Sequence, residues 1–171
     1  LPGCGACNIM GTANTMNFLT EALGMCLPGS ATPATSGRRV ALAKRTGIQI
    51  VELFNKGIKP RDVLTQNAFW NAFVVDMAIG GSTNTLLHLP AIANEAGVSI
   101  DMSMVTEIAS RTPNVLRIKP SGKHFPADLD RAGGIAALMR QLLESGLLHD
   151  TLTMTGAPIS ANVKDAAVAD S

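Results

Sequence analysis

The segment between residues 13 and 23 places an apolar side chain at every third or fourth position. These side chains are Ala13, Met16, Leu19 and Leu23. This spacing predicts a helix with one buried face. We expect Thr12 or Asn14 to cap it, because their side-chain oxygens can accept hydrogen bonds from the free N–H groups of a first turn.

A second helix is predicted over residues 39–56, with Gly57 as its end. Its apolar side is made of Val40, Ala43, Ile50, Val51 and Phe54. Its charged residues are Lys44, Arg45, Glu52 and Lys56. We therefore expect the apolar side to face the core and the charged side to face water.

Residues 67–79 are nearly all apolar, which is typical of a fully buried helix. Asp76 is the exception, and a carboxylate at such a position must be hydrogen-bonded or lie at a cleft. A glycine-led turn, residues 80–85, follows and leads into a helix that we expect to end at Gly97. Gly-Gly-Ser-Thr before a helix can hold an oxyanion, so Ser82, Thr83 and Asn84 join Asp76 as candidate cleft residues.

Short alternating runs predict strands at residues 98–102, 115–118 and 151–156. A further helix is predicted between the last two, from Asp128 to about Ser145. Because helices and short strands alternate along the chain, the expected class is α/β, with a largely parallel, short-stranded sheet flanked by helices.

Composition limits the functional classes. The 171 residues are enough for one domain, 46% are hydrophobic, and the formal net charge is +1. This charge argues against binding to nucleic acid or to a membrane surface through bulk electrostatics. No apolar run approaches the length of about 20 residues that a membrane span needs. Three cysteines, an odd number, favour a reducing compartment such as the cytoplasm, or an organelle matrix in a eukaryote.

Two thiols, Cys4 and Cys7, lie in a loop of small residues directly before the first helix. The positive end of a helix dipole favours thiolate, the form that ligates metals. Local chemistry leaves three interpretations open: buried small residues, a redox dithiol, or half of a metal site.

The longer motif is more specific. Residues 5–16 read Gly-Ala-Cys-Asn-Ile-Met-Gly-Thr-Ala-Asn-Thr-Met, residues 76–85 read Asp-Met-Ala-Ile-Gly-Gly-Ser-Thr-Asn-Thr, and residues 130–135 read Asp-Arg-Ala-Gly-Gly-Ile. In this order they resemble the dihydroxy-acid dehydratase/phosphogluconate dehydratase family. The resemblance implies the later part of a three-layer N-terminal domain, with residues 1–160 a fragment of that domain and 161–171 a linker toward a C-terminal domain.

The resemblance implies a hydro-lyase that converts a 2,3-dihydroxy carboxylic acid into a 2-keto acid. An iron–sulfur cluster, 2Fe-2S or 4Fe-4S, acts there as Lewis acid, and Mg²⁺ holds the substrate. Cys7 matches one cluster ligand, whereas Cys4 and Cys26 match none. The other cluster cysteines, the Mg²⁺ ligands and the catalytic serine lie outside this chain in family members, so the chain alone should be inactive.

Within the family, residues 14–17 and 20–24 most resemble the dihydroxy-acid dehydratases of valine and isoleucine biosynthesis, which are usually homodimers or tetramers. Residues 8–12 also resemble sugar-acid (aldonate) dehydratases. Two alternatives from other classes stay open: a non-catalytic scaffold domain, and a thioredoxin-like dithiol formed by Cys4 and Cys7.

Overall fold

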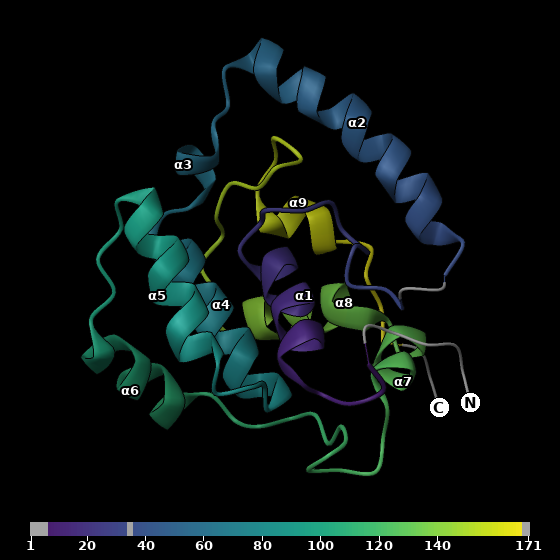
Figure 1. The fold of residues 1–171 in the computed structure, drawn as a ribbon, viewed down its shortest axis with the longest axis vertical. Helices are drawn as coiled ribbons and strands as arrows, with labels where there is room; N and C mark the ends of the chain where they lie inside the picture. The colour runs from purple at the N-terminus through teal and green to yellow at the C-terminus, as the bar shows by residue number, and fades with distance from the viewer. Residues whose placement is uncertain (1–6, 34–35, 169–171) are drawn as a thin grey trace.

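The computed structural model describes residues 7–33 and 36–168. Helices dominate these residues (Figure 1). They are α1 (Thr12–Ala22), α2 (Arg38–Lys56), α3 (Pro60–Val63), α4 (Gln66–Ile79), α5 (Thr85–Ala96), α6 (Met102–Arg111), α7 (Pro126–Arg131), α8 (Gly134–Glu144) and α9 (Ile159–Val163).

Helix α1 lies at the centre of the packed helices, with α4 and α5 on one side and α8 on the other (Figure 1). It buries Phe18 and Leu19 against this core. Helix α4 buries most of its length, including Phe69 and Phe73, as its nearly continuous apolar sequence predicts. Thr65 caps α4 by accepting a hydrogen bond of 3.3 Å from the Ala68 N–H. The arrangement fixes the start of α1 beside the end of α4.

The predicted α/β class is wrong. The described residues contain no strand and no sheet, only the isolated bridges Ile118–His124 and Leu152–Pro158. The predicted runs lie in irregular segments and turns, and Met102 already belongs to α6. Val98 and Ile100 pack partly against the core. Alternation over four or five residues records one-sided burial, which an extended loop achieves without a strand partner.

The predicted helix from Asp128 to Ser145 is two helices, α7 and α8. Gly133 and Gly134 separate them, with φ of 111° and 69°. Both values lie in the left-handed region, which interrupts a right-handed helix and which glycine adopts without a steric penalty. The acidic residues predicted near the start of the helix remain in the first of the two segments.

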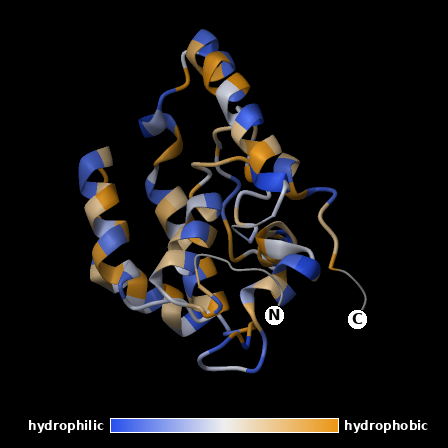
Figure 2. Ribbon diagram, turned by 45° about the vertical axis from the view of Figure 1, so that its right-hand side comes forward, coloured by the Kyte–Doolittle hydropathy of each residue, from blue (hydrophilic) through white to orange (hydrophobic). Residues whose placement is uncertain are grey.

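Helix α2 begins one residue earlier than predicted and ends at the predicted residue. Its apolar side, however, is exposed and is not buried against the core (Figure 2). It runs along the edge of the molecule, apart from the packed helices (Figure 1). Phe54 is 83% exposed and Val40 77% exposed, and Leu53 is the buried residue of the helix. The expectation that the apolar side of residues 39–56 faces the core is therefore wrong for the described residues.

The division at residue 160 stays a prediction. Helix α9 runs across this position, and its residues Ile159 and Val163 are buried. It packs against α8 as part of the same core.

Candidate functional site

Cys7 lies in the loop that leads into α1, and its side chain is partly buried. The side-chain amide of Asn14 donates to the Cys7 carbonyl at 2.7 Å and to the Ile9 carbonyl at 2.7 Å. The same nitrogen lies 3.5 Å from Cys7 Sγ. Asn14, itself buried, thus holds the loop against the first turn of the helix and places an N–H donor beside the sulfur.

The expected capping of α1 by Thr12 or Asn14 is wrong. Gly11 is the residue before the helix, and no side chain caps it. Thr12 is the first helical residue, and its hydroxyl is used elsewhere. The side chains of Thr12 and Asn14 instead bind groups outside the helix. The local sequence does not reveal these partners.

The Thr12 hydroxyl meets the turn between α4 and α5. It lies 3.0 Å from Ser82 Oγ and accepts a hydrogen bond of 2.7 Å from the side-chain amide of Asn84. Asn84 Nδ2 is also 3.2 Å from Ser82 Oγ, which closes a triangle of polar side chains. Two of the candidate cleft residues are therefore brought to the start of α1, on the same segment as Cys7. Thr83, between them, is exposed.

We call the group of side chains at the start of α1 the Cys7 cluster; it contains Cys7, Thr12, Asn14, Ser82 and Asn84. Thr15 also belongs to it and was missed in the sequence analysis. It is fully buried, its hydroxyl donates to the Gly11 carbonyl at 2.9 Å, and it accepts from the Ser82 N–H at 3.1 Å. It therefore ties the turn to α1 through the backbone. A threonine one helical turn after Thr12 was the available signal, since positions i and i+3 share a helix face.

Asp76 lies beneath the turn, near the end of α4, and is 5% exposed. Its Oδ2 accepts a hydrogen bond of 2.7 Å from the Thr85 hydroxyl, while Oδ1 has no partner among the described residues. Burial raises the pKa of Asp76 to about 6, and the hydrogen bond from Thr85 opposes this shift. Asp76 supports the turn from inside, whereas Ser82 and Asn84 lie at its outer side.

The remaining cysteines differ from Cys7. Burial raises the pKa of the Cys26 thiol to about 12, and the nearby Glu21 carboxylate adds to the shift. A thiol in this environment is a poor nucleophile and a poor metal ligand. Cys4 lies outside the described residues.

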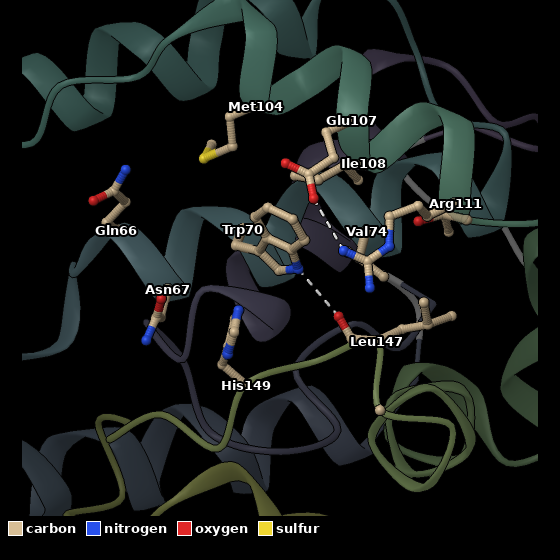
Figure 3. Close-up of a pocket in the computed structure, with 12 residues that line it drawn as sticks. Gln66, Asn67, Trp70, Val74, Met104, Glu107, Ile108, Arg111, Leu147 and His149 are labelled. Carbon is tan, nitrogen blue, oxygen red and sulfur yellow. Dashed lines mark hydrogen bonds and ion pairs between the residues drawn. The ribbon is translucent and has the colours of Figure 1, made fainter.

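A pocket of about 470 Å³ lies at the other half of α4 (Figure 3). Trp70 lies at its centre and donates from Nε1 to the Leu147 carbonyl at 3.1 Å. The Arg111 guanidinium lies 6.0 Å from the Trp70 ring centre and pairs with Glu107 at 3.0 Å. None of the predicted site residues lines this pocket, so it is separate from the cluster at Cys7.

The cluster at Cys7 fits one position of a metal site. Its sulfur is a soft ligand of the kind that iron–sulfur clusters use, and the Asn14 N–H beside it can stabilise the thiolate. Among residues 7–33 and 36–168, no three His, Cys, Asp or Glu side chains converge on one point. Within the described residues Cys7 is therefore a single candidate ligand and not part of a complete metal site.

Comparison with known proteins identifies the family of the chain. Residues 1–162 match the family described as dihydroxy-acid/6-phosphogluconate dehydratase N-terminal. The chain belongs to this family. Its relatives include proteins named dihydroxy-acid dehydratase from Caldicellulosiruptor saccharolyticus and Acetivibrio thermocellus, each 53% identical over 171 residues, or 99% of this chain. A third, from Moorella thermoacetica, is 54% identical over 95% of this chain.

The chain spans less than a third of the length of these relatives: 31%, 31% and 30%. The family resemblance seen in the three sequence motifs is therefore confirmed, for a part of the longer proteins. No helix of the described residues is both long and apolar enough to cross a bilayer.

Proposed function

We propose that this chain is part of a hydro-lyase that dehydrates a 2,3-dihydroxy carboxylic acid to a 2-keto acid in valine and isoleucine biosynthesis. In this proposal Cys7 supplies one thiolate to an iron–sulfur cluster. The observation that carries it is the position of Cys7 within a family-matched segment, with the Asn14 amide 3.5 Å from its sulfur. The names of the relatives favour this substrate class over sugar acids.

When bound, a cluster with an open iron supplies Lewis-acid chemistry at the leaving hydroxyl, and Mg²⁺ supplies a second cation for the carboxylate. The residues of this chain would hold the Cys7 loop in place and orient the substrate. Asn14 fixes the Cys7 loop through the two carbonyls at 2.7 Å. Thr12, Ser82 and Asn84 present two hydroxyls and an amide, which can hydrogen-bond the oxygens of a polyhydroxy acid. Asp76 and Thr85 hold that turn in place from below.

The proposal extends to partners and location. The substrate is a small molecule, without nucleic acid or membrane as partner, and the longer protein is a homodimer or tetramer in the cytoplasm. Remaining cluster cysteines, Mg²⁺ ligands and the base that removes the C2 proton belong to the rest of that protein. This chain by itself is then inactive as a dehydratase.

The experiment measures iron, acid-labile sulfide and visible absorption of the anaerobically purified full-length protein. Cys7→Ser should lose most of the bound iron and the cluster absorption together with dehydratase activity. Cys26→Ser is the matched control, because this thiol is shielded and its pKa is raised. It should keep iron, absorption and activity.

Three results would contradict the assignment. A Cys7→Ser protein with a full cluster would remove Cys7 from the ligand set and bring Cys4 forward. A full-length protein without iron or dehydratase activity under anaerobic conditions would favour a scaffold domain. Reversible Cys4–Cys7 disulfide formation at a defined potential would instead favour the dithiol interpretation.

A further inference from the structure

The Asn14 side chain contacts three atoms of the loop that carries Cys7. Its amide nitrogen lies 2.7 Å from the Cys7 carbonyl oxygen, 2.7 Å from the Ile9 carbonyl oxygen and 3.5 Å from Cys7 Sγ. A side-chain amide has two N–H bonds. The two short contacts therefore engage both of them, and the sulfur shares one of these donors at a longer distance. Asn14 thus acts mainly on the backbone of the loop.

Asn14 is also the described side chain that ties Cys7 to the rest of the protein. Further along the loop, the Met10 N–H donates to the Lys119 carbonyl at 2.6 Å, and the Met10 side chain is buried in the core. Among the described residues, the hydrogen bonds of Cys7 run to Asn14 or stay within the loop. Asn14 itself lies in the first turn of α1 and is 5% exposed, so it is a fixed support.

The Ile9 carbonyl gives Asn14 a second task. The Cys7 thiol donates to this carbonyl, with Sγ 3.3 Å from the oxygen. A sulfur that ligates a metal carries no proton, so this bond is lost on ligation. Two electron-rich atoms then face each other across the same loop. The Asn14 amide is a donor within reach of both atoms, and it can separate them without a change in the shape of the loop.

We propose that Asn14 is a positioning residue that holds Cys7 in its ligating conformation through the Cys7 and Ile9 carbonyls. The inference rests on the proposed function, because it takes Cys7 as a ligand of the iron–sulfur cluster. It goes further by assigning retention of that cluster to a residue that does not bind the metal. A ligand that is held in place beforehand loses less conformational freedom on binding, so the metal is bound more tightly.

The first experiment measures how fast the anaerobically purified full-length protein releases iron to an excess of a chelator. Asn14→Ala should release iron about tenfold faster than wild type or more, which is the usual cost of removing a group that orients a metal ligand. Asn14→Asp has nearly the same shape, but acceptor oxygens replace the donor and face the two carbonyls. It should release iron at least as fast, and it keeps the test decisive if Asn14→Ala does not fold.

Asn71→Ala is the matched control. Asn71 is a fully buried asparagine of α4 that holds another loop in a similar way. Its Nδ2 donates to the His149 carbonyl at 2.8 Å, and its Oδ1 accepts from the His149 N–H at 2.8 Å. These bonds do not reach the Cys7 cluster. Asn71→Ala should therefore lower the urea midpoint of unfolding, because a buried amide loses its bonds, and leave the rate of iron release unchanged.

The second experiment separates an effect on the loop from an effect on the sulfur. If Asn14 acts through the two carbonyls, Asn14→Ala should contain less cluster, while the absorption maxima of the cluster that remains stay at their wild-type positions. In the chelator-treated, iron-free protein, the Met10 amide should exchange its hydrogen about tenfold faster in Asn14→Ala than in wild type. Amides in the middle of α1 should keep their protection, which shows that the helix stays folded.

Three outcomes overturn this proposal and leave Cys7 as a ligand. These are iron release at the wild-type rate in both Asn14 variants, equal acceleration by Asn71→Ala, and shifted absorption maxima in Asn14→Ala, which would mean that the amide acts on the sulfur directly. Failure of the proposed function has a different result. A wild-type full-length protein without cluster absorption, or a Cys7→Ser protein with a full cluster, would overturn the ligand assignment and this inference with it.

Discussion

The Thr85 hydroxyl donates a hydrogen bond of 2.7 Å to Asp76 Oδ2. This bond joins the end of α4 to the start of α5 and fixes the turn that carries Ser82 and Asn84. It satisfies one carboxylate oxygen, while the other is buried without a partner among the described residues. An ionised Asp76 is therefore poorly solvated, which is the physical cause of its raised pKa.

This burial predicts a pH dependence of stability. The pKa of Asp76 rises from 3.8 to about 6 on folding, so the folded protein binds the proton more tightly than the unfolded chain. The contribution of this group is then fully present below pH 3.8 and is lost as the pH rises through 6, by about 2–3 kcal/mol. Urea unfolding of wild type and Asp76→Asn from pH 4 to pH 7.5 should show a falling difference, wild type minus variant. Parallel curves would contradict it.

The same carboxylate leaves no room at Gly81. A Cβ added there would lie 2.0 Å from Asp76 Oδ1 and 2.7 Å from Thr15 Cγ2. We expect Gly81→Ala to lower the free energy of unfolding by about 1–3 kcal/mol, because neither neighbour can move without losing its own contacts. Gly37→Ala is the control, since Gly37 has helical φ and nothing within 4 Å of an added Cβ. Equal denaturation midpoints for the two variants would disprove the crowding.

Helices with continuous or strongly periodic apolar patterns could be predicted from the sequence. The bounds of α2 and α4 follow from their spacing and from the glycines that end them. The exposure of the apolar side of α2 could not be predicted, because an amphipathic pattern indicates which side is apolar and not what covers it. The predicted α/β class was wrong for a related reason. Short alternating runs indicate one-sided burial, whether or not a second strand pairs with them.

Part of the candidate site could also be predicted. Cys7, Ser82 and Asn84 were proposed from motifs, and their functional roles stay predictions. Their connection through Thr12 and Asn14 depends on the tertiary structure, which spacing does not reveal. Asp76 was identified as an exception in an apolar run, and the structure shows why it is tolerated. Thr15 was missed because its place one turn after Thr12 indicates a shared helix face but not what meets that face, and its role depends on Ser82 approaching from 67 residues away.

Glu21 organises the loop after α1 in a comparable way. Its two carboxylate oxygens accept hydrogen bonds of 3.0 Å from the N–H groups of Gly29 and Ala31. Glu21→Gln keeps the shape but replaces one acceptor by an NH₂ that faces a backbone N–H. We expect a loss of about 1–3 kcal/mol in the free energy of unfolding, and faster hydrogen exchange at Gly29 and Ala31. Unchanged exchange at both amides would show that the carboxylate does not hold the loop.

The last prediction concerns the reactivity of Cys26. Burial and the Glu21 charge raise the pKa of this thiol to about 12, so its thiolate fraction is very small at neutral pH. We would follow the alkylation of Cys26 by iodoacetamide with peptide mass spectrometry. The reaction should be slow, and its rate should still rise about tenfold per pH unit between pH 9 and pH 10. An ordinary thiol with a pKa of about 8.5 has levelled off in this range.

Urea-unfolded protein is the control, and the alkylation rate of its Cys26 should level off at the ordinary pH. A plateau near pH 9 in the folded protein would mean that Cys26 is accessible and unshielded. Removing the Glu21 charge by Glu21→Gln should move the folded profile toward lower pH, because the carboxylate is one of the two causes of the shift.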